Sequence, residues 1–161
     1  MNVDSHQMSD QVEATSVVLG RVGEGQITFF EPVVMTDGSG YTRVPILIEA
    51  PGLSAESAIE LEGWGGWTTG LVAFFEDMAA DWRGWDGVKE WSDDGDYRTD
   101  RIAATHDGLG TVELRISTSP RLGSNDNEGK WTVELVVAID PGALEAAASG
   151  VRRLLVGPAT T

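Results

Sequence analysis

The chain has 161 residues, a length that suits a single domain with a hydrophobic core of its own. Its formal charge of −15 at pH 7 disfavours binding to nucleic acid and to anionic membrane surfaces. The charge would attract a basic protein partner, and it is also explained by solubility alone. The sequence contains no cysteine, which excludes disulfides, thiolate metal sites and a cysteine nucleophile, and we expect a cytoplasmic protein.

The two ends of the chain are predicted to be tails. Residues 1–12 are polar and lack the basic and apolar regions of a secretory signal. Residues 157–161 are expected to form a second, short tail, which leaves residues 13–156 as one domain. No apolar stretch in the sequence is long enough to span a bilayer.

The first half of the domain has the pattern of short β-strands. The predicted strands are Ala14–Leu19, Gln26–Glu31 with Pro32–Val34 as its extension, Tyr41–Glu49 and Ala58–Leu61. Pro45 lies inside one of these runs and lacks the N–H that a ladder needs. That side of its strand is therefore expected to be an edge or a bulge.

The period of the apolar residues then changes to that of an amphipathic helix. Its buried face is predicted to comprise Leu71, Phe74, Phe75, Met78 and Trp82. This register places the Trp82 ring in the core. Thr68 or Thr69 is expected to cap the start of the helix, and Gly84 to mark its end.

The second half of the domain returns to strands and ends in a helix. Strands are predicted at Arg101–His106, Thr111–Thr118 and Trp131–Ile139. Residues 123–130 form the hairpin loop between the last two, and Asp140 with Pro141 begins the final helix. The predicted buried stripe of that helix is Leu144, Ala147, Ala148, Val151, Leu154 and Leu155. Together these elements predict an α+β fold, a mainly antiparallel sheet with two amphipathic helices.

Residues 81–91, with the sequence DWRGWDGVKEW, contain three tryptophans. Buried rings would fix the end of the helix to the sheet through apolar contact. Exposed rings would stack on sugars or anchor a protein partner. The helical register assigns Trp82 to the core, whereas Trp85 and Trp91 remain candidates for a binding surface.

The same segment resembles a known family. The resemblance is carried by Gly70-Leu71 before Phe74-Phe75, by DWRGWxG at 81–87 with Trp91, by Ala104-x-His106-Asp107, and by the Trp131 strand that ends in Asp140-Pro141-Gly142. It spans Ala14 to Leu155 and is similar to the bacterial domain of unknown function family 6228, which is common in actinobacteria. More remotely, the layout resembles immunity proteins that neutralise wall-associated toxins, which implies an inhibitor-like role. The family has no settled activity, so the resemblance assigns a role to no single residue.

Two acidic loops are further binding candidates. They comprise Asp93, Asp94, Asp96 and Asp100 after the tryptophan motif, and Asp126 and Glu128 in the hairpin loop. Acidic turns of this kind also occur for purely local reasons, because aspartate and asparagine hydrogen-bond to their own backbone. Neither loop has the alternating ligands of a calcium loop, and we expect no metal and no other cofactor.

Catalysis has little support in the sequence. His106 and Asp107 are neighbours, and neighbours on a strand point to opposite faces. The sequence has no motif for an activated nucleophile or for nucleotide phosphates. The chain is therefore not expected to be an enzyme.

Two functions from different classes remain. The first is a non-enzymatic binding protein, in its sharpest form an immunity or antitoxin protein that occludes a basic protein partner. The alternative is a small-ligand or carbohydrate-binding module, with or without enzymatic activity, that uses Trp85 and Trp91 as an exposed platform. A third option is a structural domain that only self-associates.

Overall fold

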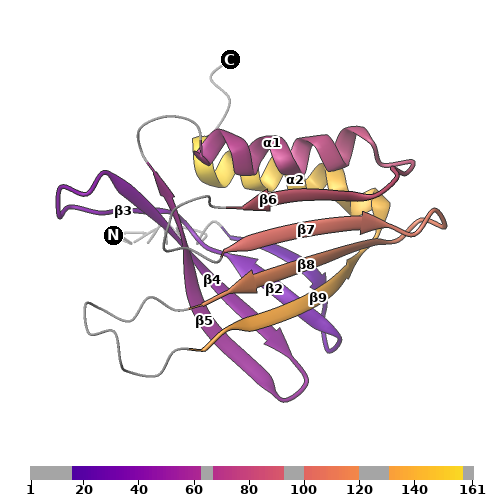
Figure 1. Ribbon diagram of the computed structural model, residues 1–161, viewed down its shortest axis with the longest axis horizontal. Coiled ribbons are helices and arrows are strands. Elements are labelled where there is room, and N and C mark those ends of the chain that lie inside the picture. Colours follow the sequence, from indigo (N-terminus) through magenta and orange to yellow (C-terminus); the bar gives the residue numbers. More distant parts are fainter. Residues whose placement is uncertain (1–15, 63–66, 93–99, 120–130, 158–161) are drawn as a thin grey trace, which may run out of the picture.

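The computed structural model describes residues 16–62, 67–92, 100–119 and 131–157. This part of the chain forms two antiparallel sheets and two helices (Figure 1), which confirms the predicted α+β class. The predicted tail at residues 1–12, nearly all of the tail at 157–161 and the hairpin loop at 123–130 lie outside the described residues.

The first sheet has five strands. They are β1 (Val17–Arg21), β2 (Gly25–Phe29), β3 (Val33–Val34), β4 (Tyr41–Ala50) and β5 (Leu53–Glu62). β4 pairs with β5 along its whole length, and it also pairs with β2 and then with β3. The predicted extension of the second run is thus a short separate strand, and the predicted Ala58–Leu61 run is the second half of a longer one.

Pro45 lies where the partner of β4 changes from β2 to β3. The ladder with β2 ends at Ile46, and the ladder with β3 begins at Arg43. Between them, the Phe30 N–H donates to the Pro45 carbonyl oxygen at 2.9 Å. Because the N and O of one residue point to the same side of an antiparallel strand, the missing N–H of Pro45 faces this interruption and removes no bond to β5.

The second sheet has four strands in sequence order. They are β6 (Val88–Ser92), β7 (Arg101–His106), β8 (Val112–Thr118) and β9 (Val133–Ile139). Alternate side chains turn inward and are buried, among them Trp91, Ile102, Leu114, Ile116 and Val137. β7, β8 and most of β9 agree with the predicted strands, whereas β6 was not predicted.

The two helices, α1 (Trp67–Ala80) and α2 (Pro141–Val156), lie side by side along one side of the molecule (Figure 1). Arg152 of α2 is joined to Glu76 of α1 by an ion pair of 2.5 Å. α2 begins as predicted, with Asp140 at the N-cap and Pro141 in the first turn. Its predicted stripe is buried at Leu144, Ala147, Ala148, Val151 and Leu154, and Leu155 is partly buried.

The start and end of α1 differ from the prediction. Leu71, Phe74, Phe75 and Met78 are buried as expected. The helix begins at Trp67, so Thr68 and Thr69 lie in its first turn and are not the cap. It ends at Ala80, before the predicted end at Gly84.

The assignment of Trp82 to the core is wrong. Its side chain is 49% exposed, because the helical period stops at Ala80 and the chain turns before Trp82 can meet the stripe. The main-chain N–H of Gly84 donates to the Asp81 carbonyl oxygen at 2.8 Å, which closes a tight turn around Trp82. The last apolar position of the predicted stripe therefore lies at the surface.

Candidate functional site

The three tryptophans of residues 81–91 occupy three different environments. Trp82 lies at the surface, Trp85 is half-buried against the core, and Trp91 is only 6% exposed. A carbohydrate platform made of Trp85 and Trp91 would need both rings at the surface. This condition is not met, and the alternative of a tryptophan platform loses its basis.

Trp91 is a core residue that joins α1 to the second sheet. It lies on the inner side of β6, and a Cβ added to Gly70 of α1 would be 3.6 Å from its Nε1 atom. The indole ring therefore lies in contact range of the helix at Gly70. For Trp91, the structure thus shows the first of the two roles considered for residues 81–91, in which a buried ring joins the helix to the sheet.

Trp85 is held by side chains from β6 and β7. Its ring meets the His106 ring edge-on at 5.3 Å between centroids, and the Lys89 Nζ atom lies 5.3 Å from its centroid. Gly84 has a φ of 130°, and a Cβ there would be 3.3 Å from the His106 Nδ1 and Cε1 atoms. Only glycine combines this backbone conformation with so close an approach.

Lys89 ties the turn after α1 to the helix itself. Its ammonium donates to the Asp77 carboxylate and, at 2.8 Å, to the Asp81 carboxylate. Burial by itself would lower the pKa of Lys89, but the hydrogen bonds and charges of Asp77 and Asp81 outweigh it and hold the pKa above the ordinary lysine value. The two carboxylates thus hold the Lys89 ammonium in place, and this cation in turn holds Asp81 at the start of the turn after α1.

We call residues 81–87 the tryptophan turn. Trp82 projects from it, with the guanidinium carbon of Arg83 4.7 Å from the centroid of its ring. Asp81 and Asp86 are both exposed beside it. An exposed indole next to carboxylates is suited to contact with a cationic surface, through apolar burial and cation–π attraction.

His106 and Asp107 are used in the turn between β7 and β8 and do not act on each other. The Gly108 N–H donates to His106 Nδ1 at 2.9 Å. The Asp107 carboxylate accepts from the Leu109 N–H at 2.7 Å and from the Thr111 N–H at 2.9 Å. These hydrogen bonds, first that from Thr111, lower the pKa of Asp107 below its ordinary value, so this carboxylate stays charged at neutral pH.

Most of the predicted acidic site residues lie outside the described part of the chain. These are Asp93, Asp94, Asp96, Asp126 and Glu128. Asp100 is half-buried and accepts a hydrogen bond of 2.7 Å from the Thr118 hydroxyl, which lies 2.9 Å from the Ser57 hydroxyl. A hydroxyl has one proton, so Ser57 donates to Thr118, and the chain of three groups links the two sheets.

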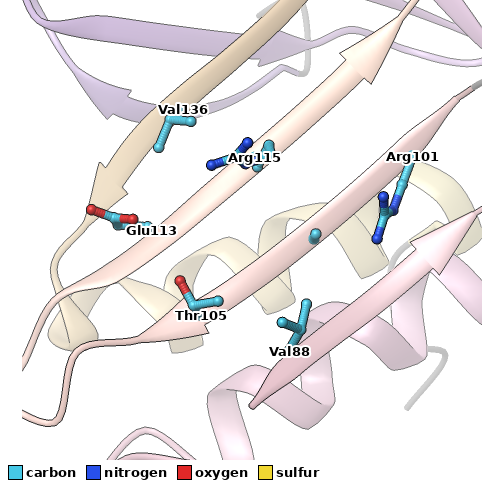
Figure 2. A pocket seen from close by; sticks show the side chains of 7 residues that line it. Val88, Arg101, Thr105, Glu113, Arg115 and Val136 are labelled. Atoms are coloured by element: carbon cyan, nitrogen blue, oxygen red, sulfur yellow. The ribbon is translucent and has the colours of Figure 1, made fainter.

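The outer face of the second sheet carries a shallow hollow of about 290 Å³. Figure 2 shows how its labelled side chains surround it, and Ala103 of β7 is among the lining residues. The lining residues are Val88, Arg101, Ala103, Thr105, Glu113, Arg115 and Val136. Val88 and Val136 are among the exposed large apolar residues of the chain.

The two arginines of this hollow are paired with carboxylates within the sheet. Arg101 is paired with Glu90, and Arg115 with Glu134 at 3.0 Å. The hollow therefore offers a shallow contact surface of mixed charge rather than a strong anion site. Among the described residues, no three histidine, aspartate or glutamate side chains are grouped so that they could hold a metal ion.

The chain matches the model of a family of unknown function, DUF6228, over residues 19–158. It belongs to this family. No curated protein matches this DUF6228 chain.

In the described part of the chain, neither helix is long and apolar enough to cross a membrane.

One solved structure similar to this DUF6228 chain is that of the plant transcriptional regulator PBF-2. The identity is 12%, the TM-score is 0.47, and the match covers 89% of this chain and 83% of the other. Similarity at this level carries no conclusion about the function of the present chain.

Proposed function

We propose that this chain is a non-enzymatic binding protein whose partner is a basic protein. The observation that supports this proposal is that most of the lysine and arginine side chains are neutralised by carboxylates of the chain itself. Of the eight lysine and arginine residues in the described part, six form ion pairs with carboxylates of the same chain. They are Arg21, Arg43, Lys89, Arg101, Arg115 and Arg152.

Carboxylates remain in excess on the surface after this pairing. Exposed residues that take part in none of these pairs include Glu31, Glu49, Glu56, Asp86, Glu113 and Glu145. The full chain carries a formal charge of −15. An anionic field of this kind attracts and orients a cationic protein and repels anionic ones.

The proposed mechanism is occlusion. The bound chain covers the active surface of its partner, and it needs no chemistry of its own to do so. The sharpest form of the proposal is an immunity or antitoxin protein in the cytoplasm of a bacterium, which the remote resemblance to toxin-immunity proteins supports. A partner that acts on nucleic acid would carry the positive surface that this charge complements.

A pull-down from the native host at low salt tests the proposal. We expect retention of a basic protein encoded beside this gene, with release of that protein as salt rises. Retention of no basic protein at low salt would contradict the proposal. An acidic variant of the same partner, with its surface lysines replaced by glutamate, serves as the control for charge and should not be retained.

The acidic residues that follow β6 in the sequence provide a second test. Asp93, Asp94 and Asp96 are predicted to contribute to the association rate, so their joint replacement by asparagine should slow association and weaken its salt dependence. Stopped-flow rates over a salt series measure this. Identical salt slopes for the two proteins would show that these three residues take no part in association, and would leave the rest of the proposal in place.

A further inference from the structure

Two turns meet at one end of the second sheet. The tryptophan turn leads from α1 into β6, and residues 107–111 connect β7 to β8. Gly84 and Trp85 of the first turn lie against His106, the last residue of β7. Both turns lie at the same end of the molecule in Figure 1, and this contact makes them neighbours in space.

Large apolar side chains are exposed at this end. Trp82 is 49% exposed, Leu109 in the second turn is 93% exposed, and Val88 at the start of β6 is 58% exposed. Single exposed apolar residues are common on protein surfaces. Trp82 and Leu109 lie on neighbouring turns, and Val88 begins the strand that follows the first turn. Such a group, with a tryptophan among its members, has the composition of the centre of a protein–protein contact.

The charges around these side chains are mostly negative. Asp81 and Asp86 flank Trp82, and Asp107 lies in the neighbouring turn. The two nearby cations already have partners. Lys89 is paired with Asp77 and Asp81, and Arg83 lies over the Trp82 ring. The exposed aromatic and aliphatic side chains therefore have acidic residues around them.

The tryptophan turn is also ordered before any partner binds. Lys89 holds its first residue, and Gly84 lies so close to His106 that an added Cβ would be 3.3 Å from the His106 ring. A turn that is held in this way loses little conformational freedom on binding, so more of the contact energy appears as affinity.

We propose that Trp82 is the anchor of the binding surface, and that it inserts into a cationic surface of a partner protein. The proposal rests on the proposed function and adds the place at which the basic partner docks. Arg83 shows how a guanidinium lies on this indole ring, and an arginine of the partner would take the ring over from Arg83 or use its opposite face. Asp86, which is exposed and takes part in none of the described ion pairs, would then pair with a further cation of the partner.

The first test uses a defined probe, a short peptide of alternating arginine and serine, and its counterpart with glutamate in place of arginine. The indole N–H signals of the six tryptophans are followed by NMR at low salt, and Trp82→Phe and Trp131→Phe assign two of them. Trp131 is the matched control, because it is 38% exposed and lies just before β9. We expect the arginine peptide to shift the Trp82 signal most and the glutamate peptide to shift none. Equal shifts at Trp82 and Trp131, or no shift at Trp82, would overturn the proposal.

The second test uses the full chain and the basic protein retained from the host. Trp82→Ala is expected to weaken its binding about tenfold or more, as for other central tryptophans, whereas Trp131→Ala leaves it unchanged. Both variants should keep the melting temperature of the wild type, which excludes misfolding as the cause. Equal binding by the two variants would overturn the role of Trp82 and leave the proposed function standing. Binding of no basic protein by any form would overturn both.

Discussion

Trp82 and Trp91 belong to one short motif, but one ring lies at the surface and the other in the core. The difference arises from the elements that carry them. Trp82 follows the end of α1, whereas Trp91 is an inward residue of β6 that packs on Gly70. Loss of the two rings should therefore have opposite consequences for stability and for binding.

Replacement of each ring by alanine tests this assignment. Trp91→Ala should lower the free energy of unfolding by about 3–5 kcal/mol, because it leaves a cavity between α1 and the second sheet. Trp82→Ala should lower it by less than about 1 kcal/mol, as expected for a surface substitution. Urea denaturation of both variants measures the difference, and equal losses would show that Trp82 is packed after all.

Gly84 provides a second test at the scale of one residue. Gly84→Ala should destabilise the fold by about 1–3 kcal/mol, because its backbone conformation is strained for alanine. The added Cβ would also press on the His106 ring. Gly87→Ala is the matched control, since its φ is also positive at 79° but no atom lies within 4 Å of the added Cβ. A loss at Gly84 no larger than that at Gly87 would show that the His106 contact gives way.

At the scale of elements, the strands and helices that were predicted well carry their signal in the local sequence. β8 alternates apolar and polar residues without a break, and Pro141 marks the start of α2. β6 was missed because Lys89 lies on its inner side, next to Trp91, and a charged inward residue hides the alternation. Only Asp77 of α1 and Asp81 just after it, which are brought there by the fold, make that position favourable for a lysine.

The exposure of Trp82 was harder to predict than the fold. Trp82 continues the period of Met78 at a spacing of four residues, so the sequence favours a longer helix. The exposed ring follows from the turn that Gly84 closes, and that turn depends on the close approach of His106 from β7. Contacts between distant segments of this kind leave no local pattern in the sequence.

The packing of α1 on α2 includes a charged contact whose strength depends on pH. The hydrogen bond from Arg152 lowers the pKa of Glu76 below its ordinary value. A depressed carboxylate pKa stabilises the fold above the pKa of the unfolded chain, near about 4.3, and this stabilisation is lost as the pH falls through the folded value. The contact is exposed, so its contribution is small.

Glu76→Gln should therefore reduce the stability of the fold at pH 7 and leave it nearly unchanged near pH 2. The difference between the variant and the wild type should close as the pH falls below about 4. Glu145→Gln is the control, because Glu145 is an exposed residue of α2 outside this ion pair. Urea unfolding over a pH series measures both variants. A constant difference at all pH values would mean that Glu76 acts through packing and not through its charge.

For the whole molecule, the excess of carboxylates opposes folding. A compact chain with a charge of −15 repels itself more strongly than an expanded one, and the described ion pairs use only part of the negative charge. Salt weakens both the repulsion and the ion pairs, so the sign of its effect shows which is larger. Exposed ion pairs contribute about 0–1 kcal/mol each, and repulsion among many unpaired carboxylates acts over a longer range.

We therefore expect the free energy of unfolding to rise with sodium chloride. The screening length falls from about 30 Å at 0.01 M salt to about 8 Å at physiological ionic strength, so most of the gain should occur in this interval. Potassium chloride should give the same curve if the effect is screening rather than binding of one ion. A bound basic partner should remove much of the dependence, because it neutralises the same carboxylates. A decrease in stability with salt would mean that the ion pairs outweigh the repulsion.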